Sequence, residues 1–306
     1  MLARLLLGIL TFEAALYATL ILLLAHIGAP LWLRVLVPIV GFLTIRGGIT
    51  GHLVRTAYRH RVPTPPDAGL SLRGWLALYL RELGYIIALY TIFFPIAPLW
   101  APRPRPGQPG LPVLLLHGYF CNRAYWWYMG RALRAHALGP IYSYTVEPPF
   151  APIDDHAARV AQRVQEIQAE TGAQRVVIVG HSMGGLMARA YVLDQGGADQ
   201  CAGIVTLGSP HHGTVFAKGG HGQNAQQMRP DSDWLAALNA RAWPEQVPIV
   251  SLWSWQDNVC FPQDTGKLDV AENTAYRGIG HMEMAFHSRV ITDTAAALKR
   301  FAAAQS

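Results

Sequence analysis

Residues 176–189 read VVIVGHSMGGLMAR, and this stretch decides the fold. Its first four residues are apolar and mostly β-branched, which is typical of a buried strand. The run Gly180-His181-Ser182-Met183-Gly184 follows directly, and a helical pattern begins at Leu186. This order is that of a nucleophile elbow, in which glycines flank a serine because the turn is too sharp for side chains there. The pattern predicts Ser182 as a nucleophile at the carboxyl edge of a sheet; the alternative is a glycine-rich turn with an idle serine.

Apolar runs and helical patterns alternate on both sides of this stretch. We expect further strands at 112–116, 141–146, 203–207 and 247–253, and helices at 125–137, 156–171 and 291–304. Strands that alternate with helices predict an α/β fold with a mostly parallel sheet flanked by helices.

The composition separates the first third of the chain from the rest. The 306 residues are 51% hydrophobic and 14% charged, against roughly 25% charged in ordinary soluble proteins. Residues 1–110 contain ten arginines and three acidic residues, whereas the remainder is nearly neutral. A basic excess confined to an apolar region indicates a membrane rather than a nucleic acid as the partner.

Three apolar segments occupy the N-terminal region, at 5–27, 31–45 and 75–100. The first is long enough to span a bilayer; whether the second spans or lies at the interface is open. We expect residues 1–100 to form a helical transmembrane region, 101–110 a Pro-rich linker, and 111–306 a catalytic domain. The alternatives are a cleaved signal peptide at the N-terminus and a helical subdomain packed on the catalytic domain.

The side of the membrane depends on the third segment, which has Trp75 and Trp100 at its ends. Within it, Arg81 and Glu82 could pair or reach towards the interface. Five arginines precede or begin this segment, at Arg46, Arg55, Arg59, Arg61 and Arg73, and predict a cytoplasmic loop. If the third segment spans, which we favour, the catalytic domain lies on the non-cytoplasmic side; if it lies flat, the domain faces the cytoplasm.

Proteins with a nucleophile elbow order their catalytic residues as serine, acid and histidine along the chain. Asp257 follows the strand at 247–253 and is the predicted acid, with Asp264 and Asp269 as rivals further along the loop. His281, preceded by Gly278-Ile279-Gly280, is the predicted base, and His287 is its rival.

The negative oxygen formed during acyl transfer needs two backbone donors. The N–H group of Met183 directly follows the nucleophile, and that of Tyr119 follows His117-Gly118 at the end of the first strand of the domain. We expect these two groups to form the oxyanion hole.

Five motifs, LLLHGYFCN, VGHSMGGLMAR, TLGSPHHGT, WQDNV and GIGHMEM, resemble in order and spacing those of bacterial lipases and esterases of the α/β-hydrolase superfamily. The resemblance runs from about residue 111 to the C-terminus. It implies an α/β-hydrolase fold, carboxylic-ester hydrolysis without a metal or organic cofactor, and His281 as the base. The secreted relatives begin with a signal peptide instead of residues 1–110, a departure that favours retention in a bacterial inner membrane.

Three features leave alternatives open. His211, His212 and His221 could be read as a metal cluster, but such sites also need well-placed acids or thiolates, and we expect no metal. Three cysteines allow one disulfide, and the candidate pair is Cys201 with Cys260. The long stretch 214–244 is a candidate lid over an acyl pocket.

The sequence therefore predicts a membrane-anchored serine ester hydrolase that acts on acyl esters, in particular lipid-like ones. Its expected partners are that substrate and the bilayer, with no nucleic acid and no obligate protein partner. An acyltransferase or a thioesterase would use the same three residues. A non-catalytic hydrolase-fold module tethered to the membrane is the alternative from another class.

Overall fold

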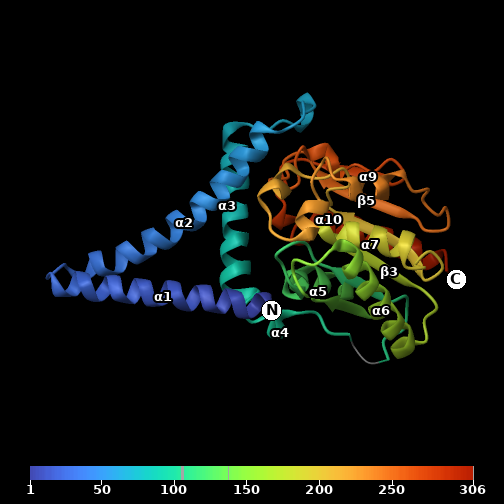
Figure 1. Ribbon diagram of the computed structural model, residues 1–306, viewed down its shortest axis with the longest axis horizontal. Helices are drawn as coiled ribbons and strands as arrows, with labels where there is room; N and C mark the ends of the chain where they lie inside the picture. The colour runs from blue at the N-terminus through green and yellow to red at the C-terminus, as the bar shows by residue number, and fades with distance from the viewer. Residues whose placement is uncertain (105–106, 137, 306) are drawn as a thin grey trace.

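The computed structural model describes residues 1–104, 107–136 and 138–305. Arg105 and Pro106 of the predicted linker, Ala137 at the end of a predicted helix, and Ser306 lie outside the described residues. The chain forms a globular α/β part and a group of long N-terminal helices beside it (Figure 1).

A six-stranded parallel sheet forms the centre of the globular part, in the order β2-β1-β3-β4-β5-β6. The strands are β1 (Val113–Leu116), β2 (Ile141–Tyr144), β3 (Val176–His181), β4 (Cys201–Leu207), β5 (Ile249–Ser254) and β6 (Glu272–Tyr276). The predicted parallel sheet is confirmed. Strand β6 was not predicted, because only Tyr276 of its five residues is buried and the segment carries no apolar run.

Helices cover both faces of this sheet. Helices α5 (Trp127–Ala135) and α10 (Ser288–Ala303) lie on one face, and α6 (Ile153–Thr171) and α7 (Met183–Asp194) lie on the other. The short helices α8 (Gln223–Gln227) and α9 (Asp233–Ala240) follow β4 in the chain. Alternate residues of each strand point to opposite faces. Val113 and Leu115 accordingly join the core under α5 and α10, whereas Leu114 and Leu116 join the core under α6 and α7.

The N-terminal helices are α1 (Leu2–His26), α2 (Leu31–Arg59) and α3 (Leu72–Ala88), which continues into a π-helical turn, η2 (Leu89–Phe93), before the short α4 (Ala97–Trp100). Helices α1 and α2 form a hairpin that projects away from the globular part, and α3 stands at the open end of the hairpin, next to the globular part (Figure 1).

Three of these helical stretches are long and apolar enough to cross a membrane: Leu2–His26, Leu31–Arg59 and Leu72–Phe93. Their apolar side chains are largely exposed; Phe12, Leu22 and Trp32, for example, are 72%, 70% and 64% exposed. Large exposed apolar surfaces of this kind mark membrane or protein contact sites, and together with the length of the helices they indicate membrane association.

The structure corrects two boundaries in this region. Helix α2 continues through Pro38 to Arg59, so Arg46, Arg55 and Arg59 are helical rather than part of a loop. Proline is tolerated within apolar membrane helices, which is why the helix does not end there. Trp100 belongs to α4 and packs against Phe93 with a ring distance of 4.8 Å, so the third apolar segment is not a single helix with a tryptophan at each end.

The hydrophobic core crosses the predicted linker. Leu6, Leu89 and Phe94 belong to the same buried cluster as residues of β1 and α10. The N-terminal helices thus pack on the globular part, and they also expose apolar side chains on their outer faces. The domain limits at 100 and 110 stay a prediction.

The three cysteines are free and buried. Cys201 begins β4, and Cys260 lies beside His281. The disulfide considered between Cys201 and Cys260 is therefore absent from the structure.

Candidate active site

Ser182 lies at the turn between β3 and α7, with φ +56° and ψ −125°. A positive φ is uncommon for a residue with a side chain, and here the Ser182 N–H donates to the carbonyl of Leu207 at 2.9 Å. A Cβ on Gly180 would come within 2.5 Å of the Gly184 backbone, and one on Gly184 would collide with the carbonyl of Leu116. The steric need for both glycines, predicted from the sequence, is confirmed.

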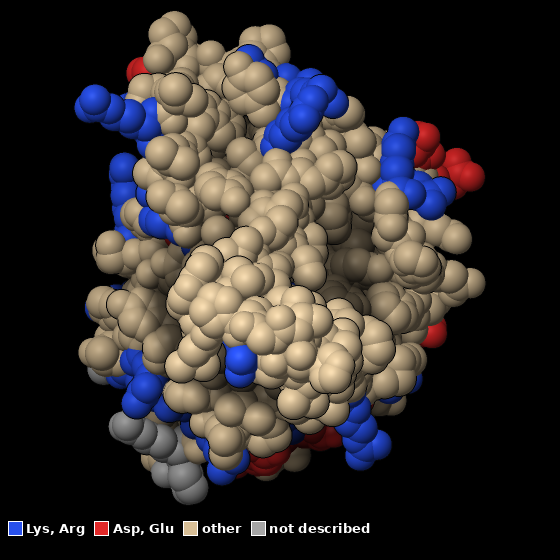
Figure 2. Space-filling view, turned by 90° about the vertical axis from the view of Figure 1, so that its left-hand side faces the viewer, with Lys and Arg blue, Asp and Glu red and all other residues tan. Residues whose placement is uncertain are grey.

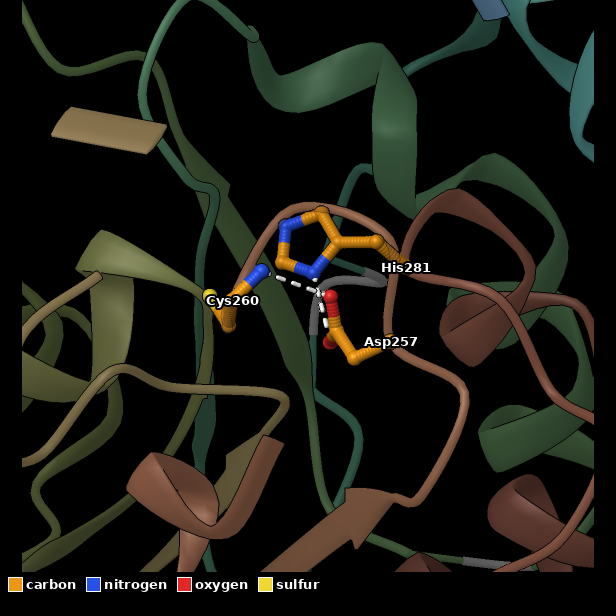
Figure 3. Close-up of side chains that lie close together, drawn as sticks. All are labelled: Asp257, Cys260 and His281. Carbon is orange, nitrogen blue, oxygen red and sulfur yellow. Dashed lines mark hydrogen bonds and ion pairs between the residues drawn. The ribbon is translucent and has the colours of Figure 1, made fainter. Parts of the chain in front are cut away.

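His281 and Asp257 form a buried hydrogen-bonded pair (Figure 3). His281 Nδ1 lies 2.9 Å from Asp257 Oδ2. The other carboxylate oxygen accepts the backbone N–H groups of Val259 at 2.8 Å and Cys260 at 2.7 Å. The aspartate follows β5, and its hydrogen bonds hold the carboxylate towards the histidine ring.

The electrostatics of the pair suit a base. Burial alone disfavours the protonated ring, but the adjacent Asp257 carboxylate, together with the Cys260 side chain, raises the pKa of His281 well above the usual value. Burial raises the pKa of the Cys260 thiol, so that this neighbour is neutral at pH 7. Among the described residues no hydrogen bond joins Ser182 Oγ to His281; the thiol interacts with both side chains. Catalytic hydrogen bonds often tighten only when substrate binds.

Two polar side chains of the globular part hold the backbone of His281. The amide oxygen of Asn258 accepts its N–H at 2.8 Å, and Nε2 of His181 donates to its carbonyl at 3.1 Å. His181 is stacked on Tyr125 with ring centroids 4.4 Å apart. Burial lowers the pKa of His181 well below the usual value, so the ring is neutral.

A third side chain that binds the backbone of the histidine loop comes from helix α3. The fully buried carboxylate of Glu82 accepts the N–H groups of Met282 at 3.2 Å and Glu283 at 2.9 Å, the two residues that follow His281. The carboxylate also lies so close to Gly280 that a Cβ there would collide with it. Glu82 therefore contacts the histidine loop both before His281, at Gly280, and after it, at Met282 and Glu283.

Arg81 binds the same loop from the next position on α3. Its Nε lies 2.9 Å from Glu283 Oε1, and its Nη2 donates to the carbonyl of Gly278 at 2.5 Å. Arg81 and Glu82 thus bind the histidine loop rather than each other. The sequence offered one signal for this role, an acidic residue within an apolar segment.

The two predicted oxyanion donors lie beside Ser182. Met183 is the first residue of α7, and N–H groups of a first helical turn have no intrahelical partner. Tyr119 follows β1 and lines the same cavity as Ser182, and Gly118 before it approaches the serine so closely that a Cβ would lie 2.7 Å from Ser182 Cβ.

The rival residues have other positions. Asp264 and Asp269 are exposed. His287 precedes α10, where its Nδ1 accepts the N–H of Arg289 at 3.3 Å as a helix cap. His211 is buried and bonds to Thr206 Oγ1 at 3.1 Å.

Asp257, Cys260 and His281 also have the spacing of a possible metal-ligand group. However, the Asp257 carboxylate already accepts three N–H groups, and the pKa of the thiol is raised by burial. A metal ion would compete for the same lone pairs and would need the thiolate. The arrangement fits an acid–base pair better than a metal site.

A cavity of about 860 Å³ opens beside Ser182 and His281. Its globular wall includes Phe216, Ala217 and Met228 from the stretch predicted as a lid. This stretch folds into η4 (Val215–Gly219), α8 and α9, and its N-terminal part is bonded to the core through Val215 N and the carbonyl of Phe261 at 2.9 Å. It forms a fixed wall of the cavity in this structure; its role as a lid stays a prediction.

Residues 112–231 match the family model described as alpha/beta hydrolase fold. The globular part has the α/β-hydrolase fold. The chain is similar to triacylglycerol lipases of Pseudarthrobacter phenanthrenivorans and Burkholderia plantarii, each 34% identical over 117 residues. These matches cover 35% of this chain and 35% and 31% of the two relatives, so the chain spans about a third of the length of the curated relatives it matches.

Solved structures agree on this fold. The lipase BlEst2 of Bacillus licheniformis superposes in its mature form with a TM-score of 0.56 at 14% identity, over 65% of this chain and 96% of that one. Its propeptide form superposes with a TM-score of 0.52 at 15% identity, over 63% of this chain and 52% of that one. The aligned share leaves room for the N-terminal helices outside the common fold.

Proposed function

We propose that this α/β-hydrolase is a membrane-anchored serine ester hydrolase of the lipase/esterase class. The observation that carries the proposal is the buried pair of His281 and Asp257, 2.9 Å apart, beside a serine on a strained elbow at the mouth of a large apolar cavity. The similarity to two triacylglycerol lipases supports the same class.

The reaction follows from these positions. His281 accepts the proton of Ser182 while Oγ attacks the ester carbonyl, and Asp257 stabilises the imidazolium that forms. The N–H groups of Met183 and Tyr119 bind the negative oxygen; one such donor contributes about 3–4 kcal/mol in the transition state. The intermediate collapses as the carbon–oxygen bond to the alcohol breaks and His281 protonates the alcohol. Water then releases the acid from Ser182 by the same steps.

We propose a lipid-like acyl ester as the substrate. The cavity beside Ser182 is lined mainly by apolar side chains from both the globular part and the exposed N-terminal helices. Such walls favour a long hydrocarbon chain over a small polar acyl group.

The membrane side depends on α3. Glu82 of this helix is buried against the histidine loop of the globular part, whereas Leu72, Leu76 and Leu80 are exposed. A helix with a globular body along one face and apolar residues on the other is suited to lie at the membrane surface. This packing supports the alternative in which the α1–α2 hairpin inserts, α3 lies flat and the catalytic part faces the cytoplasm. A reporter fused to the C-terminus separates this arrangement from the non-cytoplasmic one expected from the sequence.

The experiment that tests the activity uses p-nitrophenyl esters from acetate to palmitate and the detergent-purified full chain. Wild type is expected to hydrolyse the esters and to react with a fluorophosphonate probe, and Ser182→Ala to do neither. Ser288→Ala, an exposed serine at the start of α10, is the matched control. Equal activity in Ser182→Ala and wild type contradicts the proposal. Probe labelling without hydrolysis favours an acyltransferase or thioesterase, and the absence of both favours a non-catalytic module.

A further inference from the structure

The cavity beside Ser182 continues beyond the globular part into the N-terminal helices. Its far walls are formed by residues of α1 and α2, among them Leu6, Leu10, Leu16, Ile45, Ile49 and Leu53. Figure 2 views the molecule from the side of the hairpin: the centre of this face is almost free of charged residues and is hollowed on one side, and Lys and Arg lie mainly towards its edges.

The size of the cavity suits one lipid tail. About 860 Å³ lies in the range of ligand sites, roughly 300–1,000 Å³. Along α1 the lining residues extend from Leu6 to Tyr17, which at ~1.5 Å per residue is about 16 Å. One leaflet of a bilayer contributes half of the hydrocarbon core, or about 15 Å. The wall therefore has about the length of one acyl layer.

The position of this wall is as informative as its size. Phe12 lines the cavity and is nevertheless 72% exposed, as expected for a side chain at an opening rather than in a closed core. Since α1 and α2 are the helices whose outer faces are apolar and exposed, the opening lies where hydrocarbon would surround the hairpin.

An ion pair joins the two helices at the cavity wall. The guanidinium of Arg46 on α2 binds both oxygens of Glu13 on α1, with Nη2 2.5 Å from Oε2, and the hydroxyl of Tyr17 donates to the same carboxylate at 3.0 Å. The guanidinium also lies over the ring of Phe42 at 4.1 Å. Ion pairs within apolar helices are costly and are retained at functional sites. This pair keeps the two helical walls in one alignment.

We propose that α1 and α2 are the acyl-binding site: the tail of a membrane lipid ester enters between them from the bilayer while its carbonyl lies at Ser182. The inference rests on the proposed ester hydrolysis and adds where the tail is held. The membrane helices then serve as substrate-binding walls in addition to anchoring the enzyme.

A change of the walls tests this. Leu10→Trp and Leu53→Trp add bulk at lining positions, whereas Leu7→Trp and Leu43→Trp add the same bulk on the same helices at exposed positions outside the cavity. The readout is the ratio of kcat/KM for the p-nitrophenyl esters of palmitate and butyrate. Overpacking of this kind is expected to lower the ratio about tenfold in the lining variants, with no change in the controls.

An unchanged ratio in both lining variants, with butyrate turnover retained, overturns the inference alone. If the wild type does not hydrolyse the butyrate ester, the proposed function is overturned, and this inference is overturned with it.

A second measurement locates the tail directly. A long-chain alkyl fluorophosphonate with a photoreactive group at the far end of its tail is attached to Ser182 of the full chain in vesicles of phosphatidylethanolamine and phosphatidylglycerol. After irradiation and trypsin digestion, cross-links are expected on the peptides of residues 5–34 and 35–46, which belong to α1 and α2. Cross-links confined to the peptide of residues 219–241 overturn the proposal, because the tail would then lie against the wall formed by α8 and α9.

Discussion

Strand β3 and helix α1 are both strongly apolar, yet they differ in where their side chains lie. All six residues of β3 are buried in the sheet, whereas only Leu2 and Leu6 of the 25 residues of α1 are buried. Apolar composition predicts removal from water, but it does not name the partner, which is protein for β3 and, we infer, lipid for α1. Helix α3 combines both conditions, since one face binds the histidine loop and the other is exposed.

The same contrast between the globular part and the N-terminal helices applies to two carboxylates that contact the His281 loop. Asp257 comes from the globular part and bonds to the ring, and Glu82 comes from α3 and bonds to the backbone after it. If the comparison is right, the first is essential for the reaction, and the second positions a loop.

The largest effect is expected for Asp257→Asn. The amide cannot stabilise the imidazolium and favours the wrong tautomer of His281, so kcat is expected to fall about 10³–10⁴-fold. The measurement is butyrate ester hydrolysis by the purified full chain. Asp264→Asn, which changes an exposed acid of the same loop, is the control and should retain wild-type turnover. A comparable loss in Asp264→Asn would show that the acid was assigned incorrectly.

Glu82→Ala is expected to have the next largest effect. It leaves the N–H groups of Met282 and Glu283 without an acceptor in a buried site, a cost of about 1–3 kcal/mol, and kcat should fall about 10–100-fold with KM for butyrate nearly unchanged. Glu82→Gln retains one acceptor oxygen and should recover part of the loss. Glu245→Ala, at an exposed position, is the control.

A purely structural role for Glu82 would give a different result. The fraction of enzyme labelled by the fluorophosphonate probe would fall, while the labelled remainder would turn over at the wild-type rate. The positioning role requires full labelling at a slower rate.

The pH dependence gives a third, smaller effect. His281 must be neutral to accept the serine proton, and its pKa is raised by Asp257. Activity should therefore fall as the pH is lowered, with the midpoint of this acid limb above 6.5, the ordinary value for histidine. Removing the negative charge of Asp257 lowers the pKa of His281, so Asp257→Asn should shift the limb to lower pH. A midpoint at or below 6.5 in the wild type would contradict this account.

The smallest effect is expected for Arg81→Gln. The side chain of Arg81 is 41% exposed, whereas that of its partner Glu283 is 5% exposed. Solvent screens the Arg81 side of the pair, which limits its contribution to about 0–1 kcal/mol, and the N–H of Gly280 still donates to the Glu283 carboxylate at 3.3 Å. Turnover should change less than threefold, and the melting temperature should fall slightly. If Arg81→Gln costs as much activity as Glu82→Ala, α3 binds the loop mainly through charge rather than through the buried carboxylate.

The sequence predicted the elbow and its two glycines because both follow from a local pattern, in which strand, turn and helix are contiguous. The parallel sheet followed from repeated local patterns as well. The pairing of Asp257 with His281 followed from the order of serine, acid and histidine along the chain, from the glycines before His281 and from the resemblance to bacterial lipases. These features depend on short-range sequence or on a common topology.

The contribution of α3 could not be predicted in the same way. Glu82 contacts residues about 200 positions later in the chain, and no periodicity connects an apolar helix with a loop so distant. The length of α2 was also underestimated, because arginines in its second half resemble a loop although their long side chains can extend from a helix towards water. Strand β6 lacked an apolar run because it lies at the sheet edge and is largely exposed.

The buried cluster that joins Leu6, Leu89 and Phe94 to β1 and α10 has a practical consequence for protein engineering. A soluble version made by cutting the chain at the Pro-rich segment would lose Glu82 and would uncover an apolar surface on the remaining fragment. Solubilisation should instead keep all three helices and replace only outward-facing residues such as Leu22, Trp32 and Leu72. The N-terminal helices are therefore an integral part of the folded protein rather than a removable membrane anchor.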